Sequence, residues 1–239
     1  MKSLNTICII PARGGSKRIP RKNILPLNGK PLLTYTLQAA KEAQVFSKVL
    51  VSTEDGEIAA LAKNEGIEVD NRPEIMSGDK VTKVQVIAEF LERTKAYETF
   101  DAVACLLPTC PFRTAQDVKN AYQLFCEHHK EIPYLVGVVE YDFPIQLALT
   151  LKDHTASMEN EENYLTTRSQ NITKRYHPNG AIYLATMTAF SAKNTFFNPD
   201  MLAYVMPPER SFDIDYPYQF QIAEHYQKWL TAQDDTHGT

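Results

Sequence analysis

The segment from Pro11 to Asn23 has the residue types of a loop that holds a polyphosphate. Its adjacent glycines, Gly14 and Gly15, can adopt a positive φ and let backbone N–H groups approach an anion closely. The same segment carries five cations: Arg13, Lys17, Arg18, Arg21 and Lys22. Residues 1–41 contain eight Lys or Arg and no Asp or Glu, so the rest of the chain carries a net charge of −12. This local concentration of positive charge predicts a site for several phosphate groups.

A solvated basic loop is the alternative interpretation of this segment. The spacing differs from the G-x-x-x-x-G-K-S/T phosphate loop and from the G-x-G-x-x-G dinucleotide fingerprint, which excludes the two commonest nucleotide-binding motifs. A short run of apolar and β-branched residues, 6–10, precedes the loop and predicts a buried strand. The loop would then follow the carboxyl end of a strand, where open α/β sheets bind ligands.

Near the other end of the chain, Asp213 and Asp215 are separated by one residue. In an extended segment, residues i and i+2 point to the same side, so the two carboxylates would project together. Paired carboxylate oxygens suit Mg²⁺, which commonly binds one or two carboxylates together with substrate phosphates. An exposed Asp-x-Asp turn is the alternative.

Apolar runs alternate with amphipathic stretches along most of the chain, a pattern typical of a parallel sheet covered on both faces. The expected strands are 6–10, 49–51, 67–69, 101–107, 134–139, 181–184 and 202–206, and the expected helices are 31–43, 57–65, 81–95, 115–128 and 218–230. Between Phe143 and Arg175 the alternation breaks, and the polar stretch 152–163 suggests a hairpin or an extended insertion.

Several strings in this sequence resemble one enzyme family. They are Ile-Pro-Ala-Arg-Gly-Gly-Ser-Lys-Arg-Ile-Pro-Arg-Lys-Asn ending at Asn23, Pro-Asn-Gly-Ala-Ile-Tyr ending at Tyr183, and the segment from Arg210 to Tyr216 with its Asp-Ile-Asp. Together they are similar to the acylneuraminate cytidylyltransferases, including the pseudaminic acid branch. This resemblance implies an α/β, three-layer, Rossmann-like nucleotidyltransferase fold with a mostly parallel central sheet. It also implies that 1–239 form a single domain, with 143–175 as an inserted lobe that contributes to the sugar site and to a homodimer.

The resemblance further implies transfer of CMP from CTP to a nonulosonic (sialic-type) acid sugar, with release of pyrophosphate. The expected nucleotide-binding residues are Ala12, Arg13, Gly14, Gly15, Ser16, Lys22, Asn23, Arg72 and Pro108. The expected sugar-binding residues are Gln146, Arg168, Gln170, His177 and Asn179. Asp213 and Asp215 are expected to hold Mg²⁺, and Arg13, Lys22 and Asp215 are the expected catalytic residues. The general base and the number of metal ions stay open.

The identity of the sugar also stays open among N-acetylneuraminate, legionaminate and pseudaminate. Leu107 stands where many sialic acid enzymes have Gln. The strings 142–146 and 168–170 resemble the pseudaminic acid branch, whereas the Asn-Gly-Ala-Ile-Tyr string resembles the N-acetylneuraminate branch.

Composition limits the other functions to consider. A chain of 239 residues with 44% hydrophobic residues can bury one large α/β core. Four cysteines without C-x-x-C spacing, no secretory signal and no long apolar run predict a cytoplasmic protein without membrane contact. Nucleic-acid binding is disfavoured because the cations are confined to one loop of an acidic chain. The remaining alternatives are a transferase for an eight-carbon acid sugar and a non-catalytic nucleotide-binding regulator on the same fold.

Overall fold

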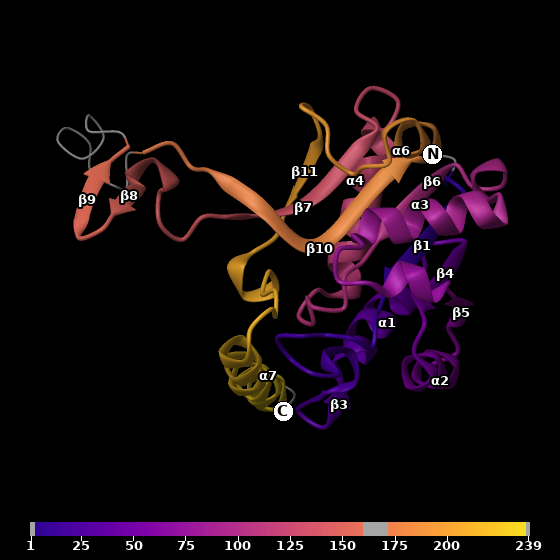
Figure 1. Ribbon diagram of the computed structural model, residues 1–239, viewed down its shortest axis with the longest axis horizontal. Helices are drawn as coiled ribbons and strands as arrows, with labels where there is room; N and C mark the ends of the chain where they lie inside the picture. The colour runs from indigo at the N-terminus through magenta and orange to yellow at the C-terminus, as the bar shows by residue number, and fades with distance from the viewer. Residues whose placement is uncertain (1–2, 160–171, 238–239) are drawn as a thin grey trace.

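The computed structural model describes residues 3–159 and 172–237, and a twisted sheet forms the centre of the molecule (Figure 1). Its strands follow the order β11-β7-β10-β6-β1-β4-β5. Their bounds are β1 Thr6–Pro11, β4 Lys48–Thr53, β5 Glu68–Asn71, β6 Ala102–Cys105, β7 Tyr134–Glu140, β10 Tyr176–Thr186 and β11 Leu202–Val205. Neighbouring strands are parallel except that β10 runs antiparallel to both β6 and β7. The predicted mostly parallel sheet is therefore confirmed.

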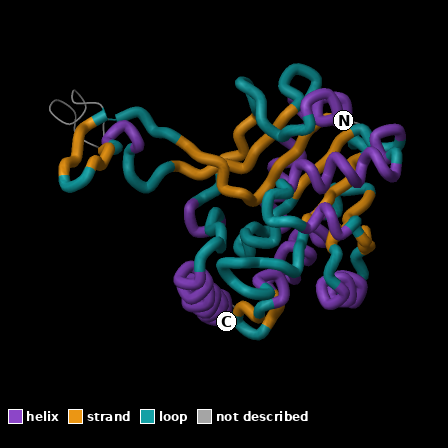
Figure 2. The backbone as a smooth tube through the Cα atoms, in the orientation of Figure 1, coloured by secondary structure: helices purple, strands orange, loops and turns teal. Residues whose placement is uncertain are grey.

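Helices cover both faces of this sheet (Figure 2). They are α1 Leu32–Ala43, α2 Gly56–Asn64, α3 Lys83–Thr94, α4 Ala115–His128 and α6 Met187–Lys193. The last helix, α7 Pro217–His237, packs instead in a separate apolar cluster with Leu27 and Leu32. Within β1, Ile7 and Ile9 pack in one apolar cluster with α3 and α6, while Cys8 and Ile10 pack in another with α1, α2 and α4. This alternation gives the three layers that the sequence predicts. The short helix α6 was not predicted.

Polar side chains cap the N-termini of α2, α3 and α4 and so determine where these helices begin. Asp55 accepts the N–H groups of Glu57 and Ile58 and so caps α2, and Thr114 forms a capping box at the start of α4. Thr82 caps α3 in the same manner. This helix therefore begins at Lys83, two residues later than predicted.

After β7 the chain leaves the main body and forms an arm, visible at the left of Figure 1. The arm contains the short helix η4 Ile145–Leu147 and the hairpin of β8 Leu149–Lys152 with β9 Thr155–Met158, before β10 leads back to the sheet. Of the two alternatives expected for 152–163, a hairpin or an extended insertion, the described residues form a hairpin, and it spans 149–158. Its proposed role in a dimer stays a prediction.

The Pro178-Asn-Gly180 string does not form the turn that such a string favours. It lies inside β10, whose pairing with β7 shifts register between Pro178 and Tyr183. Gly180 has a φ of 78°, a conformation that favours glycine, so the string forms a bulge in the strand.

Candidate active site

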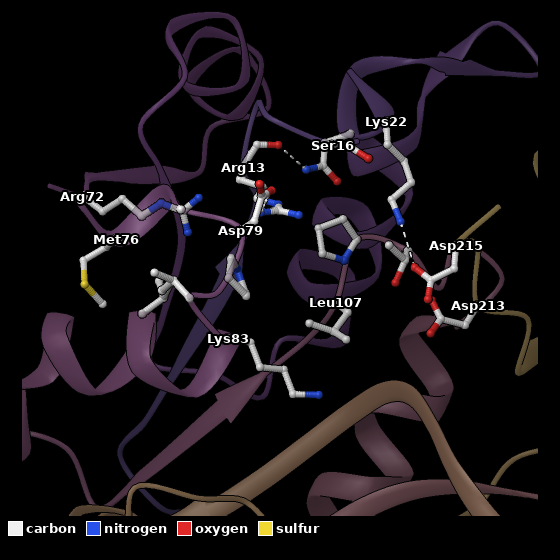
Figure 3. Close-up of a pocket in the computed structure, with 17 residues that line it drawn as sticks. Arg13, Ser16, Lys22, Arg72, Met76, Asp79, Lys83, Leu107, Asp213 and Asp215 are labelled. Atoms are coloured by element: carbon white, nitrogen blue, oxygen red, sulfur yellow. Dashed lines mark hydrogen bonds and ion pairs between the residues drawn. The ribbon is translucent and has the colours of Figure 1, made fainter. Parts of the chain in front are cut away.

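A cavity of about 420 Å³ lies at the carboxyl ends of β1, β5 and β6 (Figure 3). Four segments that are far apart in the sequence line it. Residues 11–23 follow β1, residues 72–83 lead from β5 to the start of α3, residues 107–109 follow β6, and residues 213–215 precede α7. The cavity is thus where parallel α/β sheets usually bind ligands.

The basic loop is anchored to the end of β4 through the backbone of Gly14. The Gly14 N–H donates to Oε1 of Glu54 at 2.8 Å, and a side chain at position 14 would collide with the Asp55 carboxylate. Gly14 is needed for this close approach. Neither Gly14 nor Gly15 uses the positive φ that glycine allows, since the described glycines with positive φ are Gly29, Gly66 and Gly180. Neither N–H is therefore presented by a left-handed turn.

Carboxylates hold the cations of the loop in fixed directions. Asp79 pairs with Arg13 at 3.1 Å and also with Lys17. Arg21 pairs with Asp55, the residue that caps α2. These ion pairs are partly exposed and contribute little stability each, so their main effect is to orient positive charge around the cavity.

Lys22 joins the two ends of the site. Its Nζ donates to the carbonyl oxygen of Ile214 at 2.6 Å and lies 3.2 Å from Oδ1 of Asp215. Arg18 reaches the same carboxylate, with 3.4 Å between the two groups. The basic loop and the Asp-Ile-Asp segment therefore form one wall of the cavity.

Asp213 and Asp215 both face the cavity, as their spacing predicts, because Ile214 between them is fully buried on the opposite side. Oδ1 of Asp213 is buried and has no hydrogen-bond partner in the described region of the chain. Burial raises the pKa of Asp213, and the charge of Asp215 raises it further, against the opposing effects of a hydrogen bond from the Thr109 side chain and of the charges of Lys22 and Lys83. An unpaired buried acceptor is costly, and a cation beside it would remove that cost.

These residues fit Mg²⁺ as a partial ligand set. The described residues contain no cluster of three or more His, Cys, Asp or Glu side chains arranged around a metal position. Two carboxylates would leave the remaining positions of an octahedral ion to substrate phosphates and water, as is common for Mg²⁺.

Glu54 is a site residue that sequence reasoning missed. Its carboxylate receives the Gly14 N–H and also binds Arg72, whose Nε and Nη2 donate to Oε2 at 3.0 and 2.6 Å. Burial alone would raise the pKa of Glu54, but the hydrogen bonds from Arg72 and Gly14 outweigh it and lower the pKa below its ordinary value of 4.5. Glu54 thus connects the basic loop to the buried guanidinium of Arg72.

Comparison with known proteins assigns a family to this architecture. The family model described as Cytidylyltransferase matches residues 7–228, nearly the whole chain. The chain belongs to the cytidylyltransferase family. A pseudaminic acid cytidylyltransferase from Campylobacter jejuni is 33% identical over 92% of this chain and 95% of its own length. An N-acylneuraminate cytidylyltransferase from Escherichia coli is 36% identical over 91% of this chain and 51% of its own length.

Solved structures agree on the fold of this cytidylyltransferase. A CMP:2-keto-3-deoxy-manno-octonic acid synthetase complexed with CTP superposes with a TM-score of 0.66, over 96% of this chain and 99% of its own, at 16% identity. At that identity the likeness concerns the fold alone. It confirms the predicted nucleotidyltransferase fold.

The cytidylyltransferase cavity brings together most of the residues predicted to bind nucleotide and metal. Those that line it are Arg13, Ser16, Lys22, Asn23, Arg72, Pro108, Asp213 and Asp215. Ala12 is fully buried, and neither it nor Gly14 and Gly15 is among the residues that line the cavity. Asn23 supports the loop by donating to the carbonyl oxygen of Arg13 at 2.9 Å.

Three of the five residues predicted to bind sugar belong to the described chain, and none of these three lines the cavity. Gln146 is on the arm, where its side chain donates to the Thr173 carbonyl. His177 packs against Tyr141 at the base of the arm. Asn179 is buried, and its amide bonds to Ser211 and to the Ala181 N–H. Arg168 and Gln170 lie outside the described residues. Direct contact of any of these with sugar stays a prediction.

Three further lining residues carried no sequence signal of their own: Met76, Asp79 and Lys83. Asp79 follows a loop signal and Lys83 starts a helix, so neither pattern pointed to a site. Leu107, noted for its departure from Gln, does line the cavity. None of the helices among the described residues is both long and apolar enough to span a membrane.

Proposed function

We propose that this cytidylyltransferase transfers CMP from CTP to a nonulosonic acid and releases pyrophosphate. The convergence of the basic loop and the Asp pair carries the proposal, since Lys22 contacts both Asp215 and the Ile214 carbonyl from the opposite end of the chain. The substrate class rests on the two relatives, which are named for pseudaminic acid and for N-acylneuraminate. The four unpaired cysteines support a cytoplasmic location, where thiols stay reduced.

In the proposed reaction the anomeric hydroxyl oxygen of the sugar forms a bond to the α-phosphorus of CTP. The bond between the α-phosphorus and the bridging oxygen breaks, pyrophosphate leaves, and the hydroxyl proton passes to a base. Arg13, Lys22 and Ser16 would hold the triphosphate in line with the attacking hydroxyl. Positioning and charge neutralisation supply most of the rate in this kind of transfer.

Asp213 and Asp215 would hold Mg²⁺ beside the phosphates. When bound, the ion offsets negative charge that develops on the phosphate oxygens. Arg72, fixed by Glu54 on the far wall of the cavity, would contact the nucleotide from the other side.

We also propose that the arm joins two copies of the chain. In the hairpin, Leu149 is paired with Met158 and Leu151 with Ala156, which places these four side chains on one face. All eight residues of β8 and β9 are exposed. An isolated two-stranded hairpin is marginally stable in water, so a second copy covering this apolar face would stabilise it.

The experiment is to measure pyrophosphate release with CTP, Mg²⁺ and each of N-acetylneuraminate, legionaminate and pseudaminate. We expect release with at least one sugar and its loss when EDTA removes the metal. Asp215→Ala should lower kcat/KM by at least about 100-fold, the scale of losing a group that stabilises developing charge. Asp200→Ala, at an exposed position that does not line the cavity, should leave turnover unchanged.

Two results would contradict these proposals. CTP binding without pyrophosphate release from any sugar would favour the non-catalytic regulator, and near-normal turnover by Asp215→Ala would refute the metal assignment.

A further inference from the structure

Lys83 differs from the other cations of the cavity in its partners. Arg13 is paired with Asp79, Lys22 with Asp215 and Arg72 with Glu54. For Lys83, no carboxylate of the described residues forms an ion pair or hydrogen bond. Its ammonium instead lies 3.7 Å from the centre of the Tyr183 ring. Lys83 thus brings a positive charge to the cavity that no acidic side chain of the described chain neutralises by direct contact.

The position of Lys83 opposes local stability in two ways. It is the first residue of α3, where the helix dipole is positive, and the first turn of that helix contains no acidic residue. Its side chain is half-buried, and burial lowers its pKa from the ordinary value. A cation in such a place costs folding free energy, so a role in binding explains its presence better than a role in folding.

The surroundings of Lys83 indicate which substrate it meets. In Figure 3 its side chain crosses the floor of the cavity toward Asp213, with Leu107 between it and Ser16 of the basic loop. The Tyr183 ring below the ammonium packs against Phe196 and Phe197. Tyr183 is buried and does not line the cavity, so these rings support the ammonium from behind. The lining itself includes the apolar side chains of Val81 and Leu107, which suit the apolar face of a sugar ring, whereas the triphosphate cations lie across the cavity.

We propose that Lys83 binds the carboxylate of the acid sugar and selects acidic over neutral sugars. This rests on the proposed function, because only an acid sugar brings a carboxylate to the site. The ammonium donates up to three hydrogen bonds, and in a half-buried site a carboxylate would both pair its charge and accept those bonds. The cation–π contact with Tyr183 holds the ammonium in place for that contact.

The test compares Lys83→Met and Lys83→Arg with the wild type, using whichever of N-acetylneuraminate, legionaminate or pseudaminate the wild type converts, together with the methyl ester of that sugar. Lys83→Met should raise KM for the acid sugar by roughly 10- to 100-fold, the loss expected for one hydrogen bond to a charged group. Lys83→Arg should recover some of that loss. The wild type should prefer the acid over its ester, and Lys83→Met should lose that preference. The affinity for CTP alone should change by less than about threefold, because the triphosphate keeps its own cations.

Lys80→Met is the matched control, because Lys80 is exposed, lies three residues away and does not line the cavity. Lys80→Met should leave the KM for the acid sugar and the KM for its methyl ester unchanged, which separates direct contact from a general effect of net charge.

Thermal stability supplies a second readout. The midpoint of thermal unfolding of Lys83→Met should equal or exceed that of the wild type. A lowered midpoint with an unchanged KM for sugar would overturn the proposal and show a structural role. A raised Kd for CTP would assign Lys83 to phosphate instead. Failure of the wild type to convert any of N-acetylneuraminate, legionaminate and pseudaminate would overturn the proposed function itself, whereas normal wild-type turnover with an unaffected Lys83→Met overturns the role of Lys83 alone.

Discussion

At the scale of single residues, Glu54 determines how the basic loop meets the rest of the site. One carboxylate oxygen receives the Gly14 N–H and the other binds the buried guanidinium of Arg72. Glu54 is itself only 20% exposed, so this pair is worth more than a surface ion pair. Loss of the Glu54 charge would leave the Arg72 guanidinium buried without a carboxylate to balance its charge, and an uncompensated buried charge strongly destabilises the fold.

Glu54→Gln should therefore destabilise the fold by about 1–2 kcal/mol at neutral pH and lower kcat/KM for CTP. The pKa of Glu54 is lowered in the fold, so its stabilising effect is complete above 4.5 and is lost as the pH falls through the folded pKa. The difference between wild type and variant, measured by urea unfolding, should shrink in buffers well below pH 4.5. Glu57→Gln, which changes an exposed partner of Arg21, should shift stability by less than about 0.5 kcal/mol. A difference that does not vary with pH would contradict the role of the Glu54 charge.

At the scale of elements, the segment that carries the Asp pair is held to the start of α4. The short helix η6 Pro208–Arg210 presents Arg210 to Asp117, with Nε and Nη2 at 2.9 and 3.1 Å from the carboxylate. Asp117 also closes the capping box of α4 with Thr114. Burial raises the pKa of Asp117, but the bonds from Arg210 and Thr114 outweigh this and lower it. One carboxylate thus joins a helix end to the proposed metal-binding segment.

Asp117→Asn should cost about 2–3 kcal/mol of stability, because it weakens a buried, charge-assisted group of bonds. It should also raise the Mg²⁺ concentration needed for half-maximal pyrophosphate release, since the segment up to Asp213 loses its anchor. Glu209→Gln, at the neighbouring exposed position of η6, is the control and should change neither quantity. Unfolding curves and Mg²⁺ titrations check both effects. A loss of stability with an unchanged Mg²⁺ requirement would show that other contacts position the Asp pair.

At the scale of the whole molecule, the arm projects from the main body, and no other described part of the chain covers its hairpin. Its hairpin pairs only with itself in the described sheets, and its apolar face is exposed. The chain of 27.1 kDa should therefore form a particle of twice that mass in light scattering or sedimentation. Leu151, which is 78% exposed on that face, is the residue to change. Leu151→Asp should shift the particle to the monomer, whereas Tyr97→Asp on the main body should not. A wild-type monomer at micromolar concentration would refute the proposed dimer.

Local patterns in the sequence were sufficient for much of this protein. The strand before the basic loop and the shared direction of Asp213 and Asp215 both depend on a few neighbouring residues. Alternating apolar runs likewise predicted the parallel layers, because each strand and helix carries its own periodicity. The family resemblance, based on strings of a few residues, agreed with the match over residues 7–228.

Only the tertiary structure decided which groups meet. Lys22 and Ile214 are 192 positions apart yet bonded, and Glu54 reaches Gly14 across two strand ends. Lys83 lies over Tyr183 because β6 and β10 pair beside the start of α3, and the sequence contains no local sign of this contact. Charge–charge and cation–π contacts act over a few ångströms in space, whereas sequence patterns report only on near neighbours along the chain. For that reason the residues that position the site emerged from the fold, and those that form its motifs emerged from the sequence.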